Sequence, residues 1–234
     1  MNQTIKDVSV WNLYIRLSHW LMVLLFSGLI ITGKAEEDYM QWHFYMGYLL
    51  SALLIARVLY GFWGISVAQF KHFIKGPVGL FQYAKQLISG RKPIYLGHNP
   101  LGGVMVIVLL ILLLAQVMTG LVSSDDVFWF GPLYEWVSDD LQTNMAWWHK
   151  LSPDILLGLI SCHILAVMVH EFALKERLLK AMVTGKKQSS VGKIEDAYLF
   201  KSDSSGSAPK QGVRFLLILS VSFIWLLWLW QLPI

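Results

Sequence analysis

Four histidines stand inside or at the ends of long apolar segments, where ionisable and metal-binding side chains are rare and usually functional. They are His19, His43, His149 and His163. The ordinary explanation for any one of them is a neutral imidazole bonded to a neighbouring helix. Four histidines that agree in position instead indicate metal ligation, because imidazole is a common metal ligand.

The spacing of these residues places them on helices. His149 and His163 are 14 residues apart, so they share one helix face and are separated by about 21 Å along the axis. His43 and His149 each stand at the start of an apolar segment, which we expect to lie at the outer membrane face. They form a candidate outer pair.

The other two histidines lie deeper. His19 is about 21 Å from the outer end of its segment at Gly33, and His163 is about 24 Å below Trp147. The four histidines therefore sort into two pairs at matched depths, and each pair comes from two different helices.

This pattern is typical of two b-type haems. A bis-histidine haem needs one imidazole on each side of the porphyrin, and helix bundles build such sites from facing helices. Zinc would need three or four ligands that converge on one point. Two pairs separated by about 20 Å along a helix do not offer that arrangement. No Cys-x-x-Cys-His motif is present, so we expect both haems to be bound non-covalently.

Further residues could contact the cofactors. Arg57 follows His43 by 14 residues, and a haem propionate would supply the anion that an intramembrane arginine needs. Snorkelling to the inner surface explains Arg57 equally well. Gly47 and Gly158 would leave room for the flat macrocycle, although glycine is common in membrane helices.

Three more histidines lie at the inner surface or in a loop. His170 and His98 could each bind a propionate or a quinone, but a solvated interfacial histidine is the favoured interpretation of both. His72 is interpreted as an ordinary loop residue.

Five apolar segments must position these residues. Hydrophobic residues make up 56% of the 234 residues and charged residues 15%, against about 25% in a typical soluble domain. Each segment is long enough to cross a bilayer, which takes about 20 helical residues. The segments are Trp11–Gly33, Trp42–Gly64, Leu101–Val122, Trp148–Leu174 and Phe215–Leu232. The expected fold is all-α and integral to the membrane: a four-helix transmembrane haem-binding bundle plus a fifth C-terminal transmembrane helix.

The charges between the segments predict the orientation. Residues 65–100 carry five bases and no acid, and residues 175–214 carry nine bases. Residues 123–147 carry five acids and no base. Because basic loops stay in the cytoplasm, we expect a multi-pass protein of the bacterial inner membrane, with its N-terminus inside and its C-terminus outside. The net charge of +4 then reflects topology and gives no reason to expect nucleic-acid binding.

Three domains are expected along the chain. Residues 1–183 form the four-helix di-haem domain, residues 184–212 a polar cytoplasmic linker, and residues 213–234 the fifth transmembrane helix. Within the first domain, Gly76–Ser89 has the pattern of a short amphipathic helix on the cytoplasmic surface. The first segment is interpreted as a retained helix, and the single cysteine, Cys162, suggests no redox role.

The histidine pattern and its surroundings resemble the prokaryotic cytochrome b561 family. That family includes the cytochrome b subunit of membrane-bound nickel–iron hydrogenases and is similar to the gamma subunit of formate dehydrogenase. The resemblance covers about residues 8–185. It is carried by Arg16-Leu17-Ser18-His19-Trp20, by His43 with Gly47 and Arg57, by Gly97-His98-Asn99-Pro100 with Gly102-Gly103, and by Trp148-His149 with His163 and His170.

The resemblance implies a four-helix unit with two b haems. It assigns His19 and His163 to the inner haem and His43 and His149 to the outer haem. The chain after about Gly185 departs from the minimal family pattern, so the resemblance does not assign a partner.

The main functional hypothesis is transmembrane electron transfer that links the quinone pool to a periplasmic redox partner such as a c-type cytochrome. With both axial positions filled, neither iron offers a site for a substrate. No nucleophile–base arrangement and no Gly-rich nucleotide motif is present, so we expect neither NAD nor flavin. Whether the chain is an enzyme stays open; it would be an electron-transfer subunit of an oxidoreductase system. The acidic segment 123–147 is a candidate docking surface for a basic partner; its ordinary explanation is a solvated loop.

Two alternatives remain. The chain could be the haem-bearing membrane anchor of a nickel–iron hydrogenase or similar dehydrogenase that passes electrons to quinone. It could also be a haem-free transporter or membrane metalloprotease, for which Asp154 and Glu171 are candidate carboxylates, although no zinc motif surrounds them. The sequence leaves open the direction of electron flow, the quinone and its site, and the role of the fifth helix.

Overall fold

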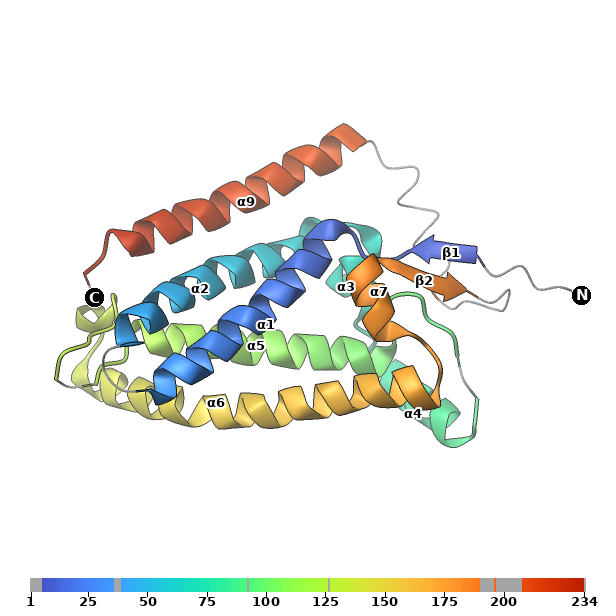
Figure 1. Cartoon of the computed structure of the whole chain (residues 1–234), viewed down its shortest axis with the longest axis horizontal. Helices are drawn as coiled ribbons and strands as arrows, with labels where there is room; N and C mark the ends of the chain where they lie inside the picture. The colour runs from blue at the N-terminus through green and yellow to red at the C-terminus, as the bar shows by residue number, and fades with distance from the viewer. Residues whose placement is uncertain are drawn as a thin grey trace, which may run out of the picture. The chain divides into compact units, whose positions relative to one another are not determined.

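Five helices are long and apolar enough to cross a membrane, as the sequence predicts. The computed structural model describes residues 6–35, 39–91, 93–125, 127–189, 196 and 208–233. Figure 1 shows the five long helices. They are α1 (Leu13–Lys34), α2 (Met40–Trp63), α5 (Pro100–Leu121), α6 (Asp139–Met168) and α9 (Ala208–Trp230). The all-helical membrane fold is therefore confirmed.

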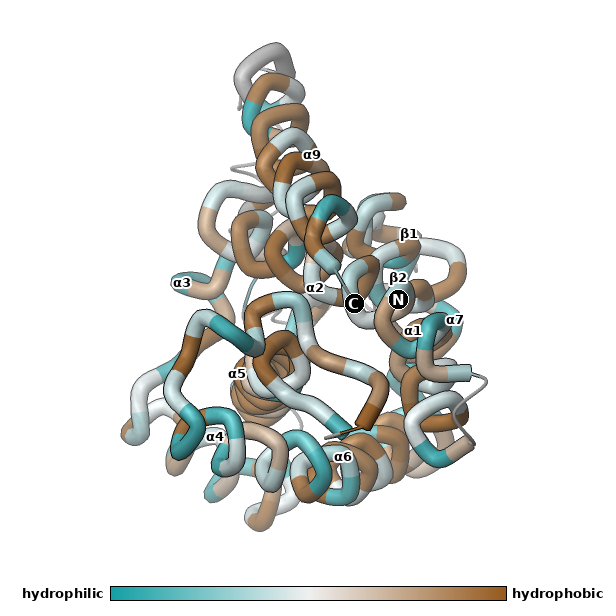
Figure 2. Tube along the Cα trace, turned by 90° about the vertical axis from the view of Figure 1, so that its left-hand side faces the viewer, coloured by the Kyte–Doolittle hydropathy of each residue, from teal (hydrophilic) through white to brown (hydrophobic). Residues whose placement is uncertain are grey.

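The helices follow the hydropathy of the sequence. The most apolar is α5, with a mean hydropathy of 2.8 over its best window. Figure 2 shows the hydrophobic colour running along α5 and α9. In contrast, the short helix α4 (Pro77–Ile88) is mixed in colour, as expected for a segment that does not cross the bilayer.

Helix α6 is longer than the sequence predicts. It begins at Asp139, nine residues before the expected start at Trp148. Asp139 and Asp140 stand in its first turn, where carboxylates interact favourably with the helix dipole and stabilise the start. Beyond Met168 the helix continues as one π-helical segment, Val169–Ala173.

The chain divides into two compact units, which are described separately. Unit 1 contains Met1–Leu17, Leu59–Ile107 and His163–Leu216. Unit 2 contains Ser18–Val58, Val108–Cys162 and Leu217–Ile234. The domain limits expected at residues 183 and 213 stay a prediction. Most of the expected linker, namely residues 190–195 and 197–207, lies outside the described residues.

Unit 1 contains a two-stranded sheet that the sequence did not predict. Strand β1 (Lys6–Ser9) pairs antiparallel with β2 (Lys186–Ser189), with Lys6 opposite Ser189 (Figure 1). Gly185 permits this junction. It has a φ of +79°, and a Cβ there would lie 2.6 Å from the Trp11 carbonyl oxygen. The Gly185 carbonyl also accepts hydrogen bonds from Val10 N and Trp11 N.

Short helices complete unit 1. They are η2 (Ser66–Ala68), α3 (Phe70–Phe73), α4 and α7 (Leu178–Thr184). A small apolar core of Val10, Val67 and Leu96 joins the N-terminal segment to the loops on either side of α3 and α4. The loop before α5 is therefore packed against the segment that precedes α1.

Helix α4 agrees with the predicted Gly76–Ser89 element and has two apolar faces. Tyr83 is buried against unit 1. On the other side Val78, Phe81 and Ile88 are 70%, 71% and 89% exposed. Because Lys85 lies within this exposed stripe, the face combines apolar side chains with a base, as interfacial helices do.

In unit 2 the C-terminal part of α9 packs on α2 and α5. Leu229 is fully buried against Tyr48 and Leu121. The Trp225 indole donates a 2.9 Å hydrogen bond to Ser51 Oγ. The C-terminal part of the fifth helix, whose role the sequence leaves open, therefore packs against α2 and α5.

Candidate functional site

The imidazoles of His43 and His149 face each other in unit 2. His43 lies in the first turn of α2, and His149 lies in α6. Their ring centroids are 6.2 Å apart, and the ring planes are at 89°. A metal–imidazole nitrogen bond is about 2 Å long and a ring nitrogen lies about 1.1 Å from the centroid, so a metal between two imidazoles separates their centroids by about 6 Å. The observed spacing fits one metal ion between the rings.

Thr32 orients the first of these rings. Its hydroxyl lies 3.1 Å from His43 Nδ1 and donates a 2.8 Å hydrogen bond to the Gly28 carbonyl. Because its proton is used in that bond, the Thr32 oxygen accepts the Nδ1 proton of His43. The Nε2 lone pair of His43 is then available to a metal, which is the usual arrangement of a ligating histidine.

Thr119 and Gln116 orient the second ring in the same way. His149 Nδ1 lies 3.0 Å from the Gln116 carbonyl oxygen and 3.2 Å from Thr119 Oγ1. Thr119 donates its own proton to the Gln116 carbonyl. The Gln116 side-chain amide lies 3.0 Å from the same Nδ1 and donates to the His149 carbonyl, while Ser152 donates to the Gln116 side chain. The two acceptors suit a proton on Nδ1, which would leave Nε2 to a metal, whereas the Gln116 amide is a donor and suits the other tautomer.

Two glycines allow the helix backbones to approach the rings. A Cβ on Gly33 would lie 3.0 Å from His43 Cε1, and a Cβ on Gly120 would lie 2.7 Å from His149 Cε1. Each glycine directly follows the threonine that contacts the same ring, so the dipeptide Thr-Gly occurs in α1 and again in α5 with one role. These residues were not predicted from the sequence, although the repeated Thr-Gly pair near two helix ends was a visible signal.

A Cβ on Gly47, one turn after His43, would meet no heavy atom within 4 Å, which leaves space beside the pair. Gly158 is exposed and stands nine residues from His149, so it does not line the same space. The described residues contain no cluster of three or more His, Cys, Asp or Glu side chains suited to a metal ion. Two opposed imidazoles with open space nearby fit a bis-histidine haem better than zinc.

A family model described as prokaryotic cytochrome b561 matches residues 10–185. The chain belongs to the prokaryotic cytochrome b561 family. This membership confirms the resemblance, and it implies haem-mediated transmembrane electron transfer with b-type haem. No curated protein matches the chain.

In this cytochrome b561 chain the two expected inner ligands lie in different units and are described on their own helices. His19 is half-buried in α1, and its ring packs edge-on against Trp20 with centroids 5.2 Å apart. His163 is half-buried in α6. Arg57 Nη1 lies 3.5 Å from Ser18 Oγ, next to His19. Arg57, which was expected to contact a haem propionate, therefore reaches the part of α1 that carries His19.

The interfacial histidines are not solvated, which corrects the favoured interpretation of their sequence positions. His98 packs between Trp11 and Phe73, with centroid distances of 4.8 and 4.7 Å. The side chain of His170 is only 17% exposed, and its Nδ1 lies 3.3 Å from Glu176 Oε2. Aromatic packing around His98 and the Glu176 carboxylate beside His170 occupy positions where we expected water.

The carboxylates considered for a metalloprotease are used elsewhere. Asp154 lies 3.9 Å from Lys34 Nζ, and its side chain is 71% exposed. Glu171 accepts a hydrogen bond from Leu179 N at the start of α7. Family membership, together with these contacts, gives no support to the haem-free alternative.

Proposed function

We propose that this chain holds two b-type haems non-covalently and carries electrons between the quinone pool on the cytoplasmic side and a redox protein on the periplasmic side. The observation that carries the proposal is the opposed pair His43 and His149, with both Nδ1 atoms bonded to protein and their centroids 6.2 Å apart. When bound, each haem would supply a one-electron iron couple with no open coordination position.

The inner pair is supported by distances along the helices. Gly33 contacts the His43 ring, so it marks the level of the outer pair on α1. From Gly33 to His19 is 14 residues, and from His149 to His163 is also 14 residues, about 21 Å in each case. His170 lies 21 residues from His149, about 31 Å along the helix, which is deeper than His19. His19 and His163 are therefore the proposed inner ligands.

Arg57 is the proposed partner of a haem propionate. It stands 14 residues after His43, at the same inner level, and contacts Ser18 beside His19. A guanidinium at this depth is stabilised by an anion. The two haem sites would lie about 21 Å apart along the helices, so an electron would cross a hydrocarbon core about 30 Å thick in shorter transfer steps.

The loop between α5 and α6 is the proposed docking surface for the periplasmic partner. Asp125 accepts backbone hydrogen bonds from Val127, Phe128 and Trp129, which fixes the loop. Burial raises the pKa of Asp125, but these hydrogen bonds outweigh it, so the net pKa is lowered and the carboxylate stays charged. Trp129 stacks on Phe44, the neighbour of His43, with centroids 5.9 Å apart. The loop surface thus reaches the residue next to an outer ligand.

The exposed acids near this loop are Glu135, Asp139 and Asp140. They complement a partner with a basic rim, such as many soluble c-type cytochromes, and would speed its encounter. The alternative, an anchor for a nickel–iron hydrogenase or similar dehydrogenase, remains compatible with the same ligands but needs a membrane-bound electron donor.

The test uses the full haem-loaded chain in lipid nanodiscs, reduced with a quinol and mixed with a basic soluble c-type cytochrome. Glu135→Lys with Asp139→Lys should lower the second-order rate at least about threefold at low ionic strength, and the difference should vanish at high salt. Gln82→Lys, a charge change on exposed α4, is the matched control and should leave the rate unchanged. A chain that quinol reduces but the cytochrome never oxidises contradicts this partner and favours the anchor role.

A further inference from the structure

The segment that follows the fourth transmembrane helix is folded in an unusual way. The π-helix Val169–Ala173 is followed by Lys175 and Arg177, which have φ values of 61° and 48°. Left-handed conformations are costly for residues with a Cβ, and both they and π-helical turns gather at functional sites. The result is a tight reversal, held by a 3.0 Å hydrogen bond from Glu176 N to the His170 carbonyl.

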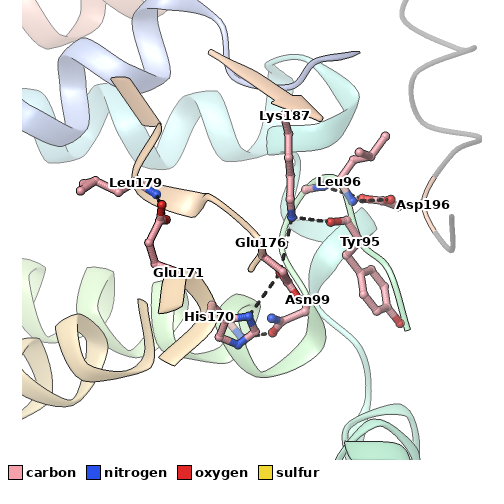
Figure 3. A network of polar contacts seen from close by, with 11 residues as sticks. Tyr95, Leu96, Asn99, His170, Glu171, Glu176, Leu179, Lys187 and Asp196 are labelled. Atoms are coloured by element: carbon pink, nitrogen blue, oxygen red, sulfur yellow. Dashed lines mark hydrogen bonds and ion pairs between the residues drawn. The ribbon is translucent and has the colours of Figure 1, made fainter. Parts of the chain in front are cut away.

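This reversal brings Glu176 against His170. Glu176 Oε2 lies 3.3 Å from His170 Nδ1 and 3.5 Å from Lys187 Nζ (Figure 3). The Lys187 side chain is 7% exposed, that of His170 is 17% exposed, and that of Glu176 is 31% exposed. Glu176 therefore connects solvent to a buried ammonium and a largely buried imidazole.

Other charged and titratable groups complete this cluster. Lys187 donates a 2.7 Å hydrogen bond to the Tyr95 carbonyl. Asp196 accepts hydrogen bonds from Leu96 N and Gly97 N in the same loop (Figure 3). Burial lowers the pKa of Lys187, and the charges of Glu176 and Asp196 partly oppose that fall. Tyr83 of α4 also lies near Glu176; burial raises the Tyr83 pKa to about 12, so its phenol is neutral.

The charges of the cluster are unbalanced when His170 is neutral. Lys187 contributes one positive charge, whereas Glu176 and Asp196 contribute one negative charge each, which leaves a net −1. One proton on the His170 imidazole brings the sum to zero. Burial raises the pKa of Glu176, but His170 and Lys187 outweigh it and lower the net pKa, so the carboxylate remains the acceptor of the pair. Glu171, on the π-helix, instead binds the Leu179 amide.

The position of His170 connects this cluster to electron transfer. It follows His163 by seven residues, two turns of the helix, so the two side chains share a face about 10 Å apart along the axis. A charge gained at the level of His163 is close enough to change the proton affinity of a partly desolvated imidazole.

We propose that His170 and Glu176 form a redox-linked proton site: His170 takes up one proton from the cytoplasm, by way of Glu176, when one electron reaches the inner half of the chain. The electron comes from the quinol or redox protein that reduces the chain, and the proton comes from water. When the electron leaves, the imidazole releases the proton. This proposal rests on the proposed function, because it needs an inner redox site beside His163.

The test is an equilibrium redox titration of the full haem-loaded chain in nanodiscs between pH 6 and pH 8.5. A tenfold change in proton concentration shifts a one-electron couple by at most about 59 mV. In the unmodified chain we expect the midpoint potential of the inner site to fall as the pH rises, by an amount per pH unit that approaches this limit. In Glu176→Gln and His170→Gln the potential should lose most of this pH dependence. Glu171→Gln, a carboxylate on the same π-helix, is the control and should keep the slope.

A second measurement is proton uptake upon reduction, followed with a pH-indicator dye. Uptake should fall in both variants and persist in the control. Unchanged slopes and unchanged uptake in Glu176→Gln and His170→Gln would overturn the proposal while leaving the two-haem account intact. Loss of one haem in His170→Gln would also overturn the proposal, because it would show that His170 is an axial ligand. Fewer than two haems in the unmodified chain would instead refute the proposed function.

Discussion

At the scale of single residues, the proposed outer haem site would depend on groups that accept a proton from Nδ1 of each ring. Thr32 and Thr119 have the same task from two different helices. Each hydroxyl gives its own proton to a carbonyl of its own helix, so it can only accept from the imidazole. These hydroxyls orient the rings and suit a proton on Nδ1 of each.

Removing one of these hydroxyls should weaken haem binding at the outer site. Thr119→Val keeps the shape of the side chain but loses one acceptor for His149 Nδ1. Because the Gln116 carbonyl still accepts that proton, we expect a loss near the lower end of the range of about 10- to 100-fold in affinity. Haem titration of the purified apoprotein measures it.

Thr143→Val is the matched control for that titration. Its hydroxyl bonds only to the Asp139 carbonyl within the exposed first turns of α6. Equal haem affinity in the two variants would show that Thr119 does not position the ligand.

The histidine pairs could be proposed as ligands from the sequence, whereas the groups that contact the rings could not. Helix rise is fixed, so the 14-residue interval between His149 and His163 gives a reliable depth. Whether Thr32 reaches His43 depends on which helices are neighbours and how they are rotated, and hydropathy does not encode this in membrane helices. The packing of His98 was missed for the same reason, because Trp11 is distant in the sequence. His170 contacts Glu176, six residues away, across a reversal that the sequence pattern does not indicate.

At the scale of elements, the long helices were predictable and the short strands were not. Each transmembrane segment satisfies its own backbone hydrogen bonds, so an apolar run is sufficient to identify it. Strands β1 and β2 are four residues each and rich in polar side chains. They pair with each other although the first four long helices lie between them in the sequence. Such nonlocal pairing leaves no local pattern in the sequence. The π-helix after α6 was not predicted either, because its residues show no pattern that separates them from an ordinary helix end.

Helix α4 gives a prediction at this scale. Its exposed residues Val78, Phe81 and Ile88, with Lys85 among them, should contact the lipid interface. A bimane label on Phe81→Cys, in a Cys162→Ser background, should be quenched by brominated lipids in nanodiscs. A label on Gln86→Cys should be quenched much less, because Gln86 is exposed on the other side of the helix axis. Equal quenching would mean that α4 does not lie on the membrane with this face.

At the scale of the whole molecule, the charge between the spans predicts the orientation. Residues 65–100 and 175–214 hold most of the bases, and the charged residues of 123–147 are all acids. Because basic loops stay in the cytoplasm, we expect the N-terminus inside and, after five spans, the C-terminus outside. A periplasm-dependent phosphatase fused after Ile234 should therefore be active. Activity only from a cytoplasm-dependent reporter at the same position would reverse the assignment.

The most direct measurement of the central claim is the haem-to-protein ratio, with an absorption spectrum, of the unmodified chain and four histidine-to-alanine variants. The account predicts two acid-acetone-extractable haems in the unmodified chain and one in each variant. His43→Ala and His149→Ala should lose the same spectral component, and His19→Ala and His163→Ala the other. A ratio of one or zero in the unmodified chain, or loss of different components within a pair, would contradict the account.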